Sequence, residues 1–219
     1  GTVLWNAAAS FQGGNSADFT NNGLFEAQAS ASIAHTFGGR NTFTNAASGI
    51  VRASGGATLT FGSVSLVSDG GEFNATAGSA IVYSGGVAQF NDGTRFTGPG
   101  AHTVSNDARF VGTFHTGNLT LTGGTQGGGT GAAISKAVLQ GALGWTGGDL
   151  VDRWEIGTGS VLTATGAANK RQVGGSIVNN GTVLWNAAAS FQGGNSAVFT
   201  NNGLFEAQAG ASIPHPFGG

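Results

Sequence analysis

Residues 1–39 read GTVLWNAAASFQGGNSADFTNNGLFEAQASASIAHTFGG, and the same stretch returns at residues 181–219 with only four changes. The changes are Asp18 to Val198, Ser30 to Gly210, Ala34 to Pro214 and Thr36 to Pro216. Self-similarity at a fixed offset is typical of a tandem array. We therefore divide the chain into one full repeat, residues 1–180, and the start of the next, residues 181–219, with no linker between them.

A shorter period inside the repeat is marked by polar turns that separate apolar stretches. Asn-Asn-Gly occurs three times, and looser versions lie between these copies. The predicted turn residues are Asn21, Asn22, Gly23, Asn45, Asp69, Asn91, Asp92, Asn179, Asn180, Gly181, Asn201, Asn202 and Gly203. The intervals from Asn21 to Asn45 and from Asn179 to Asn201 give a period of roughly 23 residues.

That period is the length of one coil of a β-solenoid, in which each coil adds two or three short strands to a stack. Residues 57–61 and 118–122 alternate apolar with polar or small side chains, as strands do. We predict an all-β chain with nearly no helix, folded as a parallel, right-handed β-solenoid (β-helix) with coils of about 20–24 residues. At about 4.8 Å per coil, roughly eight coils per repeat give a rod of about 38 Å.

The chemistry of the turn residues fits the corners of such coils. Asparagine tolerates the left-handed backbone region, and glycine adopts positive φ at little cost. Asparagine amides that lie at the same place on successive coils can also hydrogen-bond to each other as a ladder. We interpret the turn residues as this structural ladder, and the alternative is a row of ligand-binding amides.

Composition excludes several classes of function. Charged residues make up 8% of the chain, and the net charge is -2, so no basic patch exists for nucleic acid. No apolar run is long enough for a membrane span, and the absence of cysteine removes disulfides and thiolate metal sites. Fifteen phenylalanines and 39% hydrophobic residues nevertheless provide enough apolar surface for a core.

Three phrases carry a resemblance to a known kind of protein: IVNNGTVLW at residues 177–185, FTNNGLF at 199–205 and LGWTGG at 143–148. They resemble the repeats of bacterial filamentous-haemagglutinin-like proteins and autotransporter passengers. The resemblance implies a parallel β-helix in a secreted, extracellular or cell-surface protein that acts as an adhesin, stalk or fibre. It implies no catalytic motif.

The densest acidic group is Asp149, Asp152 and Glu155. Three carboxylates at this spacing would suit a calcium ion or an acid and base pair. We favour the alternative of an exposed loop between coils, with Arg153 neutralising a neighbour. Trp154 is the tryptophan expected to be exposed, whereas the other three are expected in the core. We assign no catalytic, metal or cofactor-binding residue and no cofactor.

The sequence therefore predicts a structural segment of a long extracellular tandem-repeat fibre or surface stalk, not an enzyme. Its expected partners are further copies of the repeat, in the same chain or in a homopolymer, arranged end to end and side by side. Two alternatives stay open. The first is an adhesin that binds glycans or a cell surface, and the second is a β-helix enzyme that processes polysaccharides.

Overall fold

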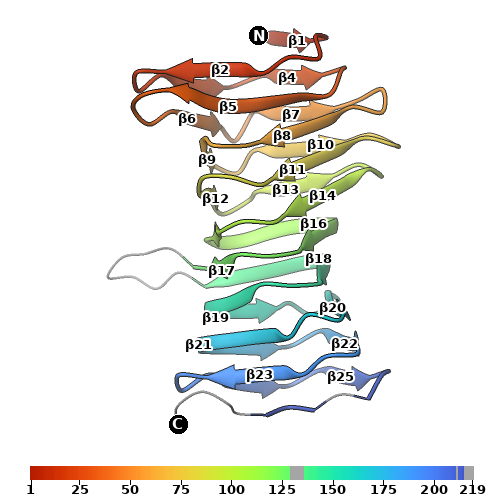
Figure 1. Ribbon diagram of the computed structural model, residues 1–219. Helices are drawn as coiled ribbons and strands as arrows, with labels where there is room; N and C mark the ends of the chain where they lie inside the picture. Colours follow the sequence, from red (N-terminus) through yellow and green to blue (C-terminus); the bar gives the residue numbers. More distant parts are fainter. Residues whose placement is uncertain (129–135, 211, 215–219) are drawn as a thin grey trace.

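The computed structural model describes residues 1–128, 136–210 and 212–214, and these residues form a β-solenoid (Figure 1). They contain 25 β-strands and no helix, and every strand pairing is parallel. The first strand, β1, and the last strand, β25, lie at opposite ends of the stack (Figure 1). The predicted all-β parallel solenoid is therefore confirmed, while the handedness of the coil stays a prediction.

The pairings sort the strands into three columns, which we call the first, second and third faces. The first face contains β1 (Thr2–Trp5), β4 (Leu24–Ala27), β7 (Ile50–Ala53), β10 (Glu72–Ala75), β13 (Arg95–Thr97), residues 112–116 of β16 (Gly112–Leu121), 137–141 of β18 (Ala137–Trp145), 153–156 of β19 (Asp149–Ile156), 176–179 of β21 (Lys170–Asn179) and β24 (Val198–Asn201).

The second face contains β2 (Phe11–Gly14), β5 (Ala31–Phe37), β8 (Thr58–Phe61), β11 (Ala80–Tyr83), β14 (Ala101–Val104), residues 119–121 of β16, 142–145 of β18, β20 (Val161–Gly166), β22 (Thr182–Ala187) and β25 (Leu204–Ala207). The third face contains β3 (Asp18–Asn21), β6 (Thr42–Asn45), β9 (Ser65–Ser68), β12 (Ala88–Phe90), β15 (Ala108–Phe110), β17 (Thr125–Gly127), residues 149–151 of β19, 170–173 of β21 and β23 (Phe191–Gly194).

Alternate side chains of each strand point into the coil and form a continuous core. In β7 and β10 the burial alternates residue by residue, as the two-residue period of a strand requires. Phe73 of β10 pairs with Val51 in the coil before it and with Phe96 in the coil after it. The rings of Phe73 and Phe96 are stacked at 5.8 Å. Inward-facing side chains at equivalent positions of successive coils therefore form apolar columns along the axis.

The length of a coil varies more than predicted. The coil that runs from Ala137 to its partner Trp154 is short. The coil that runs from Leu24 to its partner Ile50 is about half as long again. The corners absorb the difference, because they lie outside the paired strands and their length can vary. Gly175, at a corner of β21, has φ 66°, and a Cβ there would collide with the carbonyl oxygen of Asp152. Glycine is required at that corner for both reasons.

The repeat of residues 1–180 does not span a whole number of coils. The 21 strands from β1 to β21 make 25 passages across a face, because β16, β18, β19 and β21 each cross two faces. At three passages to a coil, the repeat is eight and one third coils long. The second copy therefore begins on the second face, whereas the first copy begins on the first face.

Candidate interface at the ends of the stack

The two copies of the repeated sequence are covered on opposite sides. In the second copy, β22 lies on β20 and β23 lies on β21. In the first copy, β1 pairs with β4 and β2 pairs with β5, and among the described residues no strand lies on their other edge. The same sequence is thus seen once with its N-terminal edge open and once with that edge paired.

Burial of the aromatic residues follows this difference. Trp185 is 1% exposed and Phe191 is 5% exposed, whereas the equivalent Trp5 and Phe11 are only partly buried. Above Trp185 lies Ala164, and above Ala164 lies Trp145. The small side chain of Ala164 lets the two indole rings meet edge to face at 6.3 Å. Residues of the preceding coils therefore complete the packing that Trp5 lacks.

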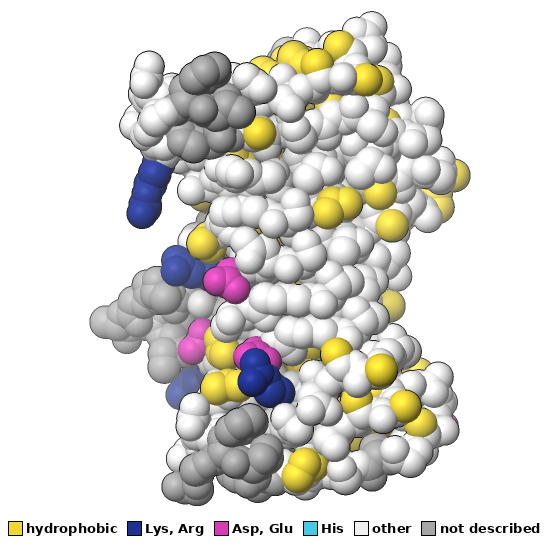
Figure 2. Space-filling model, viewed as in Figure 1, with side chains coloured by type: hydrophobic (Ala, Val, Ile, Leu, Met, Phe, Trp, Pro, Cys, Tyr) yellow, Lys and Arg dark blue, Asp and Glu magenta, His cyan; other side chains and the backbone are white. Residues whose placement is uncertain are grey.

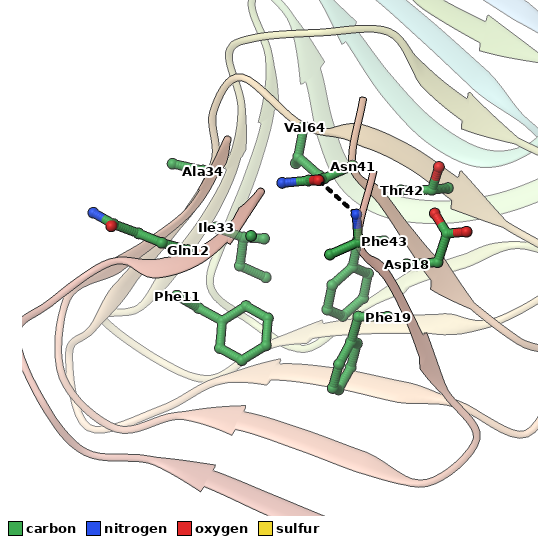
Figure 3. Close-up of a pocket in the computed structure, with 12 residues that line it drawn as sticks. Phe11, Gln12, Asp18, Phe19, Ile33, Ala34, Asn41, Thr42, Phe43 and Val64 are labelled. Carbon is green, nitrogen blue, oxygen red and sulfur yellow. Dashed lines mark hydrogen bonds between the residues drawn. The ribbon is translucent and has the colours of Figure 1, made fainter. Parts of the chain in front are cut away.

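The open N-terminal end is hollowed by an apolar cavity of about 140 Å³ (Figure 3). Phe11, Phe19, Ile33, Phe43 and Val64 supply its apolar wall. The rings of Phe11 and Phe19 meet edge to face at 5.3 Å. Such a wall suits apolar side chains, because it leaves hydrophobic area to be removed from water.

One polar side chain at this cavity is incompletely satisfied. The Asn41 side chain is 5% exposed, and its Oδ1 accepts a hydrogen bond of 3.0 Å from the backbone N–H of Ala17 (Figure 3). Its Nδ2 is buried against Gly13 and has no hydrogen-bond partner among the described residues. An unpaired buried amide costs free energy in the folded state.

The C-terminal end shows the reverse pattern. Leu204 is 51% exposed and Phe205 is partly buried, although the equivalent Phe25 is 1% exposed. Phe25 is covered because β7 continues the first face after β4, and Val51 pairs directly with it. Each end of the stack therefore exposes apolar side chains that the same sequence buries elsewhere in the chain.

Charged side chains are few (Figure 2), and three pairs of them join neighbouring coils in the described residues. Arg171 holds both carboxylate oxygens of Asp149 at 2.6 Å, and Arg95 lies 3.4 Å from Glu72. Burial would raise the pKa of Glu72, but hydrogen bonds from Thr97 and Arg95 outweigh it and lower that pKa. These pairs stabilise the stacking of coils.

The predicted turn residues fall at two different corners of the coil. The Asn21 Nδ2 donates to Asn45 Oδ1 at 2.9 Å, at the end of the third face. The Asn179 Nδ2 donates to Asn201 Oδ1 at 2.7 Å, at the end of the first face. The structure thus places these amides in two separate short ladders, because the second copy is displaced by one face.

The other predicted turn residues lie beside these ladders. Asn91 donates to Asp69 at 2.6 Å, and Asn202 donates to Asn180 at 2.9 Å. Asp92 Oδ1 accepts from the backbone of Thr113. Asn22 offers its carbonyl to Ser48, and Gly23, Gly181 and Gly203 follow the ladder asparagines at places where a Cβ would meet backbone of the previous coil.

The acidic group is not a loop. Asp149, Asp152 and Glu155 belong to strand β19, so the expectation of an exposed loop is wrong. The strand turns from the third to the first face at Asp152, whose φ is 63°, and this corner separates the other two carboxylates. Their partners are Arg171 and Lys136 on neighbouring coils, not Arg153. Hydrogen bonding to Lys136 lowers the pKa of Glu155.

Trp154 is 2% exposed, so its expected exposure is also wrong. It alternates inward with Ile156 in β19, and its ring lies 5.4 Å from that of Phe110. Sequence reasoning took it for a surface residue because of its acidic neighbours. In a solenoid strand, however, neighbours along the chain point to opposite sides, so they say nothing about burial.

No metal site is formed by three or more His, Asp or Glu side chains within the described part of the chain. His102 is buried next to Phe96, and its Nε2 lies 2.9 Å from the carbonyl oxygen of Thr97. Burial lowers the pKa of this imidazole, which favours its neutral form in the core. No helix long and apolar enough to cross a membrane occurs in the residues that are described.

Sequence reasoning missed one buried cation. Lys170 at the start of β21 is completely buried, and its ammonium donates to the carbonyl oxygen of Ala168 at 2.5 Å. Burial lowers the pKa of Lys170. No sequence signal marks this lysine as different from Arg171 beside it, because only the alternation of the strand decides which of the two points inward.

The chain matches no protein-family profile, no curated protein sequence and no solved structure. The interface at the ends of the stack is therefore interpreted from its own geometry.

Proposed function

We propose that this chain is a structural segment of an extracellular tandem-repeat fibre or surface stalk, in which successive repeats stack end to end as one rod. The observation that carries the proposal is the junction between the two copies. There, β22 to β24 continue the ladders of β20 and β21 without a gap, and Trp185 and Phe191 are buried.

The junction supplies a template for both ends. Residues 156–180 cover the N-terminal edge of the second copy, so the same segment of a preceding repeat fits over β1 and β2. Residues 31–53 cover the C-terminal edge of the corresponding strands in the first copy, so their equivalents further along the second copy fit under β24 and β25. Further copies of the repeat are the partner that this surface chemistry favours.

Covalent continuity fits this template better than contact between separate chains. After β25, which is equivalent to β4, the template requires the equivalent of β5. If a second molecule placed its own β1 there, equivalents of β1 to β4 would follow β25 for a second time. The side chains of successive coils would then no longer match those of the template. We therefore propose that the repeats follow each other in one polypeptide, with side-to-side contact as a separate, weaker association.

The extracellular placement rests on the resemblance to bacterial surface repeats and on the low charge of the chain. A glycan-binding adhesin is less well supported. Three of the four tryptophans, Trp145, Trp154 and Trp185, are at most 2% exposed and offer no stacking surface for a sugar.

A polysaccharide-processing enzyme is also less well supported, because such an enzyme needs carboxylates that are free to act in a cleft. Asp107, Arg109 and Asp152 line a hollow of about 170 Å³. Asp107 Oδ1 already accepts a hydrogen bond of 2.8 Å from the backbone N–H of Thr125. The three ion pairs of the described residues likewise join carboxylates to cations of a neighbouring coil.

The test compares the present chain with one extended at its C-terminus by a second copy of residues 40–180. We expect the extended protein to unfold in urea as one cooperative unit, with a higher midpoint than the present chain, because the apolar side chains of β24 and β25 become buried. Electron cryo-microscopy should show single rods about 80 Å long, from about 4.8 Å per coil.

Separate unfolding of the added segment, or two particles joined by a flexible connection, would overturn the proposal. A matched control appends the same segment in scrambled order, which keeps length and composition but removes the ladder. That control should leave the urea midpoint of the original chain unchanged.

A further inference from the structure

We infer that successive repeats of this fibre are displaced by one face of the coil, so that each surface feature is displayed in three directions in turn. The inference rests on the proposed end-to-end stacking, but its structural basis lies within the present chain. It follows from the length of the repeat, which is eight and one third coils.

The displacement is visible in four consecutive strands. The first copy places β1 and β4 on the first face, β2 on the second and β3 on the third. The second copy places the equivalent strands β22 and β25 on the second face, β23 on the third and β24 on the first. Every strand has moved on by one face, and none has kept its place.

Local structure is unchanged by the move, which shows that the corners of the coil are interchangeable. Asn15 and Ser16 have φ 55° and 63° between the second and third faces. Their equivalents Asn195 and Ser196 have φ 53° and 59° between the third and first faces. The same turn therefore forms at two different corners, so this segment moves on by one face without a change of backbone conformation.

Charge is redistributed by the same displacement. Among the described strands of the second face, the one ionised side chain is Glu206 in β25. Its equivalent, Glu26, lies on the first face. The first copy has no Asp, Glu, Lys or Arg in its described second-face strands. The second copy places there the residue types that the first copy carries on its first face. Further along the same second copy, the equivalents of Glu72 and Arg95 would follow Glu206 on this face.

A fibre built this way has no continuous uncharged stripe. In any one direction, the uncharged face returns once in three repeats, about 120 Å apart at about 4.8 Å per coil, and it appears in the other two directions in between. A partner that recognises any patch of the repeat therefore meets it in three rows around the rod. With a whole number of coils, all copies would lie in one row.

The first test uses the present chain, which has no cysteine of its own. Thr163 and Leu184 are direct partners on the second face, so the double variant Thr163→Cys, Leu184→Cys should form a disulfide under mild oxidation. The control Val178→Cys, Leu184→Cys joins the first face to the second and should remain reduced. Both variants replace outward-facing, partly exposed side chains, and circular dichroism of the reduced forms checks that they fold.

Failure of Thr163→Cys, Leu184→Cys to cross-link in a folded protein, or efficient cross-linking of the control, would overturn the displacement and leave the fibre proposal untouched. The second test uses a chain of three repeats with Thr60→Cys and its equivalents labelled with gold. Images should show labels in three directions around the rod. Labels in a single row would overturn the inference, whereas the absence of a continuous rod would overturn the fibre proposal instead.

Discussion

Residues 1–27 and 181–207 differ at one position, yet the structure buries different parts of them. Both copies form the same pairing, Thr2 with Leu24 and Thr182 with Leu204. Val3 is 36% exposed, whereas Val183 is 3% exposed because β20 lies on β22. The comparison teaches that burial in a solenoid belongs to the neighbouring coils and not to the segment itself. Equivalent substitutions in the two copies should therefore have unequal effects.

The largest expected difference concerns the equivalent tryptophans. Trp185→Ala should lower the free energy of unfolding by about 3–5 kcal/mol, because it opens a cavity beside Ala164 and Phe191 in a closed core. Trp5→Ala should cost less than about 2 kcal/mol, because its site is already partly open to solvent. Urea unfolding of the two variants, which have identical composition, measures the difference directly.

Equal costs at Trp5 and Trp185 would contradict the assigned burial. A second comparison uses the chain extended by one repeat at its N-terminus. In that protein a preceding coil covers Trp5, as β20 covers Trp185 in the present chain. In that protein the cost of Trp5→Ala should rise to the value for Trp185→Ala.

An intermediate difference is expected for the ladder asparagines. Asn21 is 4% exposed, and its Nδ2 donates to Asn45 Oδ1 and to the carbonyl oxygen of Ile50 at 3.1 Å. Asn21→Ala should cost about 1–3 kcal/mol, because buried acceptors lose their donor. Among the described residues, the exposed Asn201 donates to Gly203 at 3.1 Å and accepts from Asn179 at 2.7 Å. Water can replace both bonds at this open end, so Asn201→Ala should cost about 0.5 kcal/mol.

Thermal or urea unfolding of the Asn21 and Asn201 variants gives both values. If Asn201→Ala were the more damaging of the two, the amide ladder would stabilise the end of the stack more than its interior. That result would contradict the view that coverage by the next coil sets the strength of each ladder.

The smallest effect concerns Lys170, which lies in the coil that covers the second copy. Lys170→Met should stabilise the protein by about 1 kcal/mol at pH 7, because it removes a buried ammonium and keeps the volume of the side chain. Its pKa is lowered from 10.5 in the folded state, so the folded protein binds this proton less tightly than the unfolded chain.

The sign of the pH dependence follows from that lowered pKa. The contribution of Lys170 should become more favourable as pH rises from the lowered pKa toward 10.5, so the advantage of Lys170→Met should shrink over that window. Arg171→Met is the matched control, because the Arg171 side chain is exposed and paired with Asp149. It should be neutral or slightly destabilising. If the difference in free energy of unfolding between Lys170→Met and the original chain stayed the same at high pH, the burial of a charged ammonium would be contradicted.

Much of the fold could be predicted from the sequence, because a solenoid is built from local signals. Alternation in residues 57–61 corresponds to β8, and the Asn-Asn-Gly turns after Asn21 and Asn179 fall at corners. Trp154 and Lys170 could not be placed in this way. Trp154 follows the corner at Asp152, where the phase of the alternation changes without glycine. Lys170 begins a strand directly after polar residues, so the sequence does not show that its side chain, and not that of Arg171, points inward.

The candidate interface could be predicted only in outline. The recurrence of residues 1–39 at residues 181–219 predicts that the repeats follow one another. A uniform period would divide the repeat into nearly eight coils, but the coil from Ala137 to Trp154 is much shorter than the coil from Leu24 to Ile50. Such irregular lengths hide the extra third of a coil, so the displacement between copies could not be read from the spacing.

By itself, the sequence determined the local conformation of each segment. The Trp5 indole donates to Ala9 at 3.1 Å and the Trp185 indole to Ala189 at 3.2 Å, and the corners at Ser16 and Ser196 share one backbone conformation. These features depend on residues within a few positions of one another. The tertiary structure alone decided which face each copy occupies and which of its side chains are buried. The face depends on the number of strands that precede the copy, and the burial depends on the strands on both sides of it in the stack.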